Sequence, residues 1–128
     1  MSKDLVRSKN YELATRQHPD TELGELETAA IRQVIGGEKL LFPLLFRLVE
    51  EDYGPEGDLS IMPSQLLAFK EELERFQKLV AARGSDETIY SFGRAKIAGQ
   101  QLALLSDSLL HITQEAIRGN ESLFAFAD

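Results

Sequence analysis

The sequence predicts a mainly α-helical protein, a single domain of residues 1–128 built as a bundle of four or five helices. Apolar residues recur at spacings of three and four in residues 66–80 and 98–116, which is the period of an amphipathic helix. Hydrophobic residues make up 43% of the 128-residue chain. A chain of this length buries roughly two-thirds of its unfolded surface, so we expect one hydrophobic core.

The N-terminal part predicts one weak element and one helix. The alternating residues 11–15 indicate an N-terminal arm or an edge strand within residues 1–20. Asp20 or Thr21 is a suitable N-cap for the first helix, whose apolar residues are three or four apart. The glycine pair at 36–37 ends this helix.

Residues 40–49 form an apolar run that predicts a second, central helix. Pro43 fits the first turn of that helix, because an N-terminal residue has no intrahelical partner for its N–H. The helix is expected to reach Asp52 or Tyr53.

A third helix is predicted between Pro63 and Gly84, with the proline in its first turn. Its apolar stripe consists of Leu66, Phe69, Leu73, Phe76 and Val80. We interpret this stripe as core, and not as the seam of an intermolecular coiled coil.

The C-terminal part predicts a short helical segment and then the longest helix. Ser85 is a candidate N-cap for residues 86–92, and Gly93 separates this segment from a helix over residues 94–118. Gly119-Asn120 stops that helix. The tail, residues 122–127, either pairs as a strand with the N-terminal segment, giving a minor two-stranded element, or packs its two aromatic rings on the bundle.

Negative charge is concentrated in one part of the chain. The net charge is −7, and residues 21–60 hold nine acids against three bases. The densest part is residues 50–58, with five acids and no base. The predicted partner-binding residues lie here: Glu50, Glu51, Asp52, Tyr53, Glu56 and Asp58. This surface favours a basic protein partner and disfavours nucleic acid. The alternative interpretation of these acids is that they only keep the protein soluble.

Composition excludes several classes of protein. The chain has no cysteine, which removes disulfide and thiolate-zinc sites and suits a reducing compartment. The N-terminal residues lack the apolar core of a signal peptide, and the apolar run at 40–49 is too short to cross a bilayer. We therefore expect a cytoplasmic protein without membrane insertion.

Catalytic and cofactor signatures are weak, so no catalytic residue, metal ligand or cofactor is predicted. His111 and Glu115 lie one helical turn apart and supply at most half of a metal site, with a structural histidine as the simpler interpretation. His18 lies in a predicted loop. Gly36-Gly37 lacks the spacing of a phosphate-binding loop, and residues 50–58 lack the ligand pattern of a calcium loop.

The order of several segments resembles small immunity proteins of bacterial polymorphic toxin systems. These segments are the apolar residues 40–43, the acidic turn, residues 59–63 leading into a helix with Glu71-Glu72-Leu73, and the closing residues 115–120. The resemblance implies a bacterial, non-enzymatic inhibitor whose acids meet a basic toxin. No binding residue is carried over from the family.

The leading hypothesis is therefore an immunity-type, protein-binding domain that occludes a basic partner. One alternative is a helical-bundle enzyme or sensor with a metal or small ligand near His111. Another is a homo-oligomeric scaffold that uses an apolar helix stripe. The identity of the partner and the oligomeric state stay open.

Overall fold

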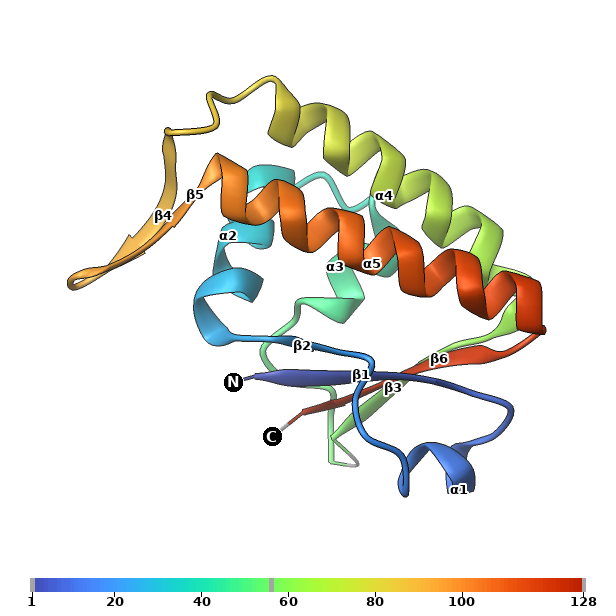
Figure 1. Ribbon diagram of the computed structural model, residues 1–128. Coiled ribbons are helices and arrows are strands. Elements are labelled where there is room, and N and C mark those ends of the chain that lie inside the picture. Colours follow the sequence, from blue (N-terminus) through green and yellow to red (C-terminus); the bar gives the residue numbers. More distant parts are fainter. Residues whose placement is uncertain (1, 56, 128) are drawn as a thin grey trace.

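The computed structural model has a mixed α/β fold, so the prediction of a mainly α-helical bundle is wrong. The structure describes residues 2–55 and 57–127. A four-stranded antiparallel sheet carries helices on one face, and a separate two-stranded hairpin projects from one end (Figure 1). In chain order the elements are β1 (Lys3–Ser8), α1 (Tyr11–Ala14), β2 (Thr21–Leu23), α2 (Glu25–Ile35), α3 (Pro43–Leu48), β3 (Asp58–Ile61), the 3₁₀ turn η1 (Pro63–Gln65), α4 (Leu66–Ala81), β4 (Thr88–Phe92), β5 (Ala95–Ala98), α5 (Gly99–Gly119) and β6 (Ser122–Ala127).

The N-terminal strand lies inside the sheet, which corrects the prediction of an arm or edge strand in residues 1–20. The strand order is β2-β1-β6-β3, and all neighbours are antiparallel. Lys3 pairs with Ala127 and Ser8 with Ser122, so the two ends of the chain form the centre of the sheet. Of the two alternatives for the tail, the structure has the pairing with the N-terminal segment, but the partner strand is Lys3–Ser8 and the sheet has four strands instead of two.

The two long helices confirm the apolar stripes. α4 and α5 run side by side above the sheet, and α5 contacts β1 and β6 directly, while α2 and α3 pack against α4 (Figure 1). The stripe of α4 and the stripe of α5 are buried in the same core cluster, which also includes Leu5, Leu123 and Ala125 on the helix side of the sheet. Asn120, in the left-handed conformation, ends α5 as predicted. Intramolecular packing therefore accounts for both stripes.

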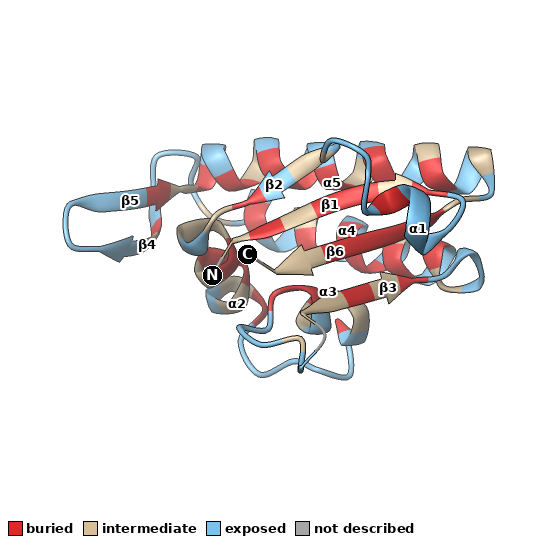
Figure 2. Cartoon of the chain, turned by 90° about the horizontal axis from the view of Figure 1, so that it is seen from below, coloured by how far each residue is buried: buried red, intermediate tan, exposed pale blue. Residues whose placement is uncertain are grey.

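The opposite face of the sheet carries a small aromatic cluster. Here α1 covers part of β1 and β6, as the view from below shows (Figure 2). The ring of Tyr11 contacts Phe124 and Phe126, with centroids 6.0 and 5.9 Å apart. Val6 and Ala14 are buried beside them. The alternating residues 11–15 thus belong to a short helix, and the strand expected there lies earlier in the chain.

Three further expectations need correction. α3 ends at Leu48, and Leu40, before its start, is 97% exposed, so the second helix is shorter and less central than predicted. Residues 59–61 are a strand paired with β6. Residues 86–98 contain the hairpin β4–β5, whose Thr-Ile-Tyr-Ser-Phe sequence has the β-branched and aromatic character of strands.

A buried carboxylate determines where α3 begins. The side chain of Glu72, on α4, accepts hydrogen bonds from the N–H groups of Leu44 at 3.0 Å and Leu45 at 2.9 Å. These N–H groups lie in the first turn of α3, where no intrahelical acceptor exists. Burial raises the pKa of Glu72, while the two N–H donors and Arg75 oppose the rise. α4 therefore caps α3 through a tertiary contact.

We expect Glu72→Ala to lower the free energy of unfolding by about 1–3 kcal/mol, because it leaves two N–H groups without their acceptor. Glu72→Gln should lose less, since the amide oxygen still accepts one hydrogen bond. Glu71→Ala removes the same charge from an exposed neighbouring position and is the matched control. Urea unfolding measures all three. Equal stabilities of the Glu71 and Glu72 variants would contradict the capping role.

Candidate functional site

The acidic loop, residues 50–58, connects α3 with β3, and the structure describes all of it except residue 56. It presents the exposed side chains of Glu50, Glu51 and Asp52 next to one another. The carboxylate of Asp52 accepts a hydrogen bond from the N–H of Gly54 at 2.7 Å, which shapes the turn. These three predicted partner-binding residues therefore share one exposed turn.

The other predicted site residues are placed differently. Tyr53 turns inward, and its hydroxyl donates to the carbonyl oxygen of Leu48, so its ring packs at the end of α3 and is not part of the exposed group. Asp58 lies at the start of β3 and accepts a hydrogen bond from the hydroxyl of Tyr11 at 2.9 Å. Glu56 lies outside the described residues. Among the described residues, the exposed acidic group therefore consists of Glu50, Glu51 and Asp52.

A buried lysine lies directly beneath the acidic loop. The side chain of Lys3 is 0% exposed, and its Nζ donates to the carbonyl oxygen of Glu50 at 2.6 Å. The same Nζ is 3.4 Å from the carbonyl oxygen of Glu51 and 3.8 Å from the centroid of the Tyr53 ring. A buried ammonium is unfavourable without such partners, so Lys3 requires the loop backbone to stay in this position.

Arg32, on α2, holds the loop from the other side. Its Nη1 donates to the carbonyl oxygen of Val49, and its Nη2 lies 3.5 Å from a carboxylate oxygen of Glu51. The Glu51 side chain is 82% exposed, so this ion pair faces solvent and stabilises little. Arg32 therefore acts mainly by fixing the backbone at Val49.

The protein environment moves two pKa values beneath the loop. Burial lowers the pKa of Lys3, and the nearby charge of Arg32 adds to this effect, while Asp52, Glu50 and Glu51 oppose it. Burial, together with the charge of Glu50, raises the pKa of the Tyr53 phenol well above its usual range. Part of the loop's negative charge thus compensates the positive charge of Lys3.

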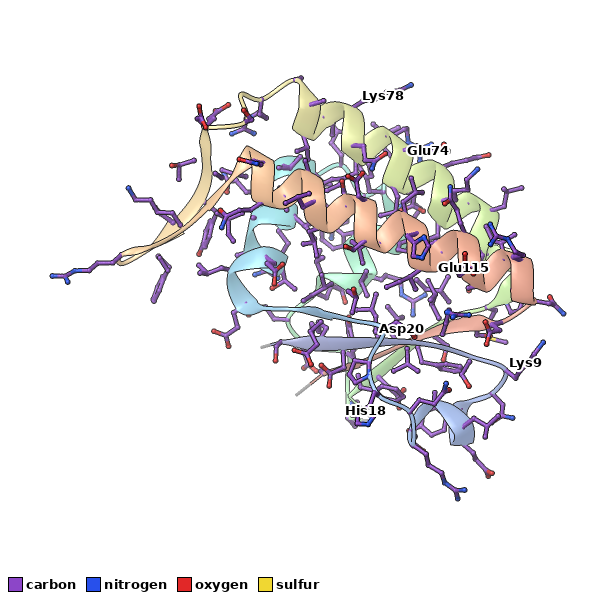
Figure 3. All side chains as sticks on the ribbon, viewed as in Figure 1. Lys9, His18, Asp20, Glu74, Lys78 and Glu115 are labelled. Atoms are coloured by element: carbon purple, nitrogen blue, oxygen red, sulfur yellow. The ribbon has the colours of Figure 1, made fainter. Side chains whose placement is uncertain are left out.

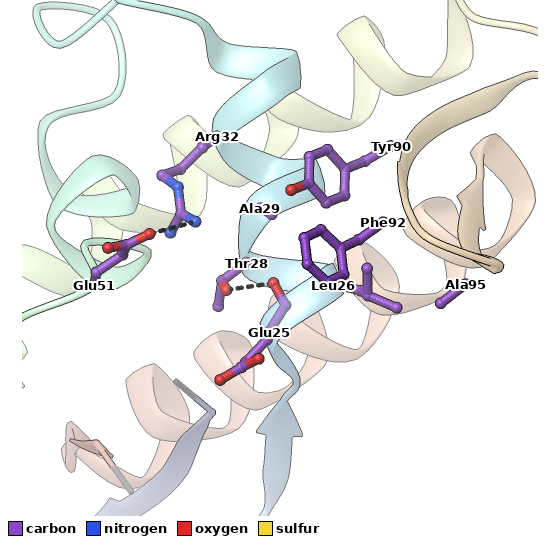
Figure 4. A pocket seen from close by; sticks show the side chains of 9 residues that line it. All are labelled: Glu25, Leu26, Thr28, Ala29, Arg32, Glu51, Tyr90, Phe92 and Ala95. Carbon is purple, nitrogen blue, oxygen red and sulfur yellow. Dashed lines mark hydrogen bonds and ion pairs between the residues drawn. The ribbon is translucent and has the colours of Figure 1, made fainter.

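A groove of about 540 Å³ adjoins the acidic loop between α2 and the hairpin (Figure 4). Leu26 and Ala29 form its α2 side, while Tyr90, Phe92 and Ala95 approach from the hairpin. The polar lining comes from Glu25, Thr28, Arg32 and Glu51. Arg32 and Glu51 therefore belong to both the groove and the loop region.

The hairpin β4–β5, which forms one wall of the groove, is held at its base by buried side chains and backbone contacts. Ile89 and Ile97 are buried in the core. The N–H of Gly99 donates to the carbonyl oxygen of Glu87 at 2.9 Å, and a Cβ on Gly99 would lie 2.5 Å from the carbonyl oxygen of Gly84. At the tip, Gly93 has φ of 61°, which a two-residue hairpin turn requires. Phe92, next to the turn, is 75% exposed.

The alternative site near His111 receives no support. His111 is exposed, and the carboxylate of Glu115 is bound by Arg118 at 2.8 Å. Figure 3 shows Glu115 on α5 and His18 in the loop below the sheet, on the other side of the strands. Within residues 2–55 and 57–127, no three His, Cys, Asp or Glu side chains are close enough to hold a metal ion.

Comparisons with known proteins supply no relative. No family model matches the chain, and neither a curated protein nor a solved structure is significantly similar to it. Within the part of the chain that the structure describes, no helix is long and apolar enough to cross a membrane.

Sequence reasoning missed three residues that matter for this site: Lys3, Arg32 and Phe92. Lys3 and Arg32 contact the loop from elements far away in the sequence, so local patterns contain no signal for them. Phe92 carried a signal, because residues 88–92 favour a strand and Gly93 favours a turn. Interpreting that segment as a hairpin would have predicted an aromatic residue next to its turn.

The ionisation of Tyr53 is the first prediction for this region. In alkaline solution, absorbance near 295 nm should give the same phenolate signal for wild type and Tyr53→Phe while both are folded, because buried Tyr53 keeps its proton. After unfolding, wild type should gain one additional phenolate. Since the folded pKa is raised, ionisation of the unfolded state above about pH 10 lowers the stability of wild type relative to Tyr53→Phe. One additional phenolate in folded wild type would contradict the buried position.

The base of the hairpin gives a second prediction. Gly99→Ala should lower the free energy of unfolding by about 1–3 kcal/mol, because the new Cβ meets the carbonyl oxygen of Gly84. Helix propensity alone predicts the opposite sign at the start of α5. Gly37→Ala is the control, since its Cβ would meet no atom within 4 Å. A stabilised Gly99→Ala variant in urea unfolding would show that the contact is absent.

Proposed function

We propose that this protein is a non-enzymatic, protein-binding domain that uses the acidic loop to cover a basic surface of its partner. The immunity-type inhibitor implied by the sequence resemblance is the particular form of this proposal. In that form the domain neutralises a toxin by steric and electrostatic occlusion, in the cytoplasm. Tyr53 is assigned a supporting role beneath the loop, because its ring faces inward.

The observation that carries the proposal is the fixed backbone beneath the exposed carboxylates. Lys3, Arg32 and Tyr53 each donate a hydrogen bond to a backbone carbonyl between residues 48 and 51. A loop held in one conformation loses less conformational entropy when a partner binds. The start of the acidic loop, with the exposed carboxylates of Glu50 and Glu51, is therefore a preorganised negative surface, which favours rapid association with a basic partner.

Charge compensation is the competing explanation of the loop acids. The carboxylates of Glu50, Glu51 and Asp52 each raise the pKa of Lys3 and so stabilise its charged form. A purely structural role requires these charges for stability, whereas a binding role requires them for association. The two roles are separable, because neutral isosteric replacements leave the backbone carbonyls that bind Lys3 in place.

The binding test compares wild type with Glu50→Gln/Asp52→Asn. Wild type used for affinity capture from its native host should retain one stoichiometric basic protein at low salt and release it at about 0.5 M salt, where surface charges are screened. The loop variant should lose this protein while remaining folded.

Glu71→Gln/Glu74→Gln is the matched control, because it removes the same charge from exposed positions on α4. It should retain the partner. Partner retention by the loop variant, or equal losses in both variants, would contradict the assignment of the acidic loop as the binding surface.

A further inference from the structure

We infer that the groove between α2 and the hairpin β4–β5 binds an arginine side chain of the partner, with its stem against Phe92. This inference deepens the proposed function and rests on it. It assigns a specific docking position beside the acidic loop, where the proposed function requires only negative charge. The position is defined by Leu26 and Ala29 on one wall and by Tyr90 and Phe92 on the other.

The first argument is the exposed aromatic ring. Phe92 is 75% exposed at the end of a two-stranded hairpin, and it lines the groove opposite α2 (Figure 4). The buried Ile89 and Ile97 and the close contact of Gly99 with Gly84 hold the hairpin stem. An exposed aromatic ring on a hairpin whose base is held buries apolar area on binding, which is the property of an interface anchor.

The second argument is the chemistry of the walls. Apolar and aromatic groups line the groove, and its charged end, formed by Arg32 and Glu51, adjoins the exposed carboxylates of Glu50 and Asp52. Acids outnumber bases at this end, so a complementary occupant has an apolar stem and a positive end. A guanidinium stacks on an aromatic face and binds a carboxylate through two parallel hydrogen bonds. Lysine forms neither contact as well, because its ammonium is compact and more strongly hydrated.

The third argument is the state of Glu51. Its carboxylate is 82% exposed and lies 3.5 Å from Arg32 Nη2, while Arg32 Nη1 is engaged by the carbonyl oxygen of Val49. Arg32 therefore neutralises Glu51 only in part, because its guanidinium is shared with the carbonyl oxygen of Val49. The carboxylate retains acceptor capacity for the arginine of a partner.

The test uses three capped peptides, Gly-Leu-Xaa-Leu-Gly with arginine, lysine or glutamine at Xaa, titrated into the ¹⁵N-labelled protein at low salt. The arginine peptide should shift the backbone amides of Leu26, Ala29 and Phe92. It should bind more tightly than the lysine peptide, and the glutamine peptide should not bind. Phe92→Ala should weaken binding of the arginine peptide about fivefold, equivalent to about 1 kcal/mol of cation–π and apolar contact.

One control variant and one further site variant complete the test. Leu104→Ala removes an apolar side chain that is 62% exposed on α5, outside the groove, and should leave binding unchanged. Glu51→Gln should weaken binding of the arginine peptide more than that of the lysine peptide.

The outcomes separate this inference from the proposed function. Amide shifts confined to residues 50–58, with no effect of Phe92→Ala, would overturn the assignment of the groove as the arginine-binding position. The acidic loop would then remain as the binding surface. Absence of binding by the arginine peptide, or equal binding of the arginine and lysine peptides, would also overturn the inference. If the loop variant loses the captured partner and the arginine peptide shifts the amides of Leu26, Ala29 and Phe92, the results support both the acidic loop and the groove as binding positions.

Discussion

The buried ammonium of Lys3 needs hydrogen-bond acceptors, and this requirement fixes the relative positions of several segments that are far apart in the chain. Lys3 belongs to the central strand β1, whose pairing with β6 brings the two ends of the chain together. Its Nζ must then find acceptors away from water, and the carbonyl oxygen of Glu50 at 2.6 Å supplies one. The sheet, the end of α3 and the acidic loop therefore depend on the same contact.

The helical layer contains a second tertiary constraint of the same physical kind. Glu72 on α4 accepts the N–H groups that begin α3, and α3 leads directly into the acidic loop. In both places a buried charged side chain satisfies backbone groups of a separate element. The segment between α2 and β3 is thus positioned from outside by Lys3, Arg32 and Glu72, and its own helix has just six residues.

This arrangement explains how an acidic segment can be both structural and available for binding. The backbone of the loop faces Lys3, Arg32 and the Tyr53 hydroxyl, whereas the carboxylates of Glu50 and Asp52 face solvent. The groove lies next to this surface because Arg32 and Glu51 contribute to both. A basic partner therefore meets a charged loop and an aromatic wall on adjoining parts of the molecule.

Local patterns were enough to predict α4, α5 and the C-cap at Asn120, because helical periodicity and capping act over a few residues. It also located the exposed acids of the loop. Three features follow only from the way the whole chain folds: Lys3–Ser8 lies inside a sheet, Lys3 binds the carbonyl oxygen of Glu50, and Phe92 lies opposite α2. These contacts join residues far apart in the chain, where the free energy comes from burial and pairing. Local sequence patterns contain no signal for such long-range contacts. The apolar helix stripes therefore predicted a helical bundle and left out the sheet on which the helices pack.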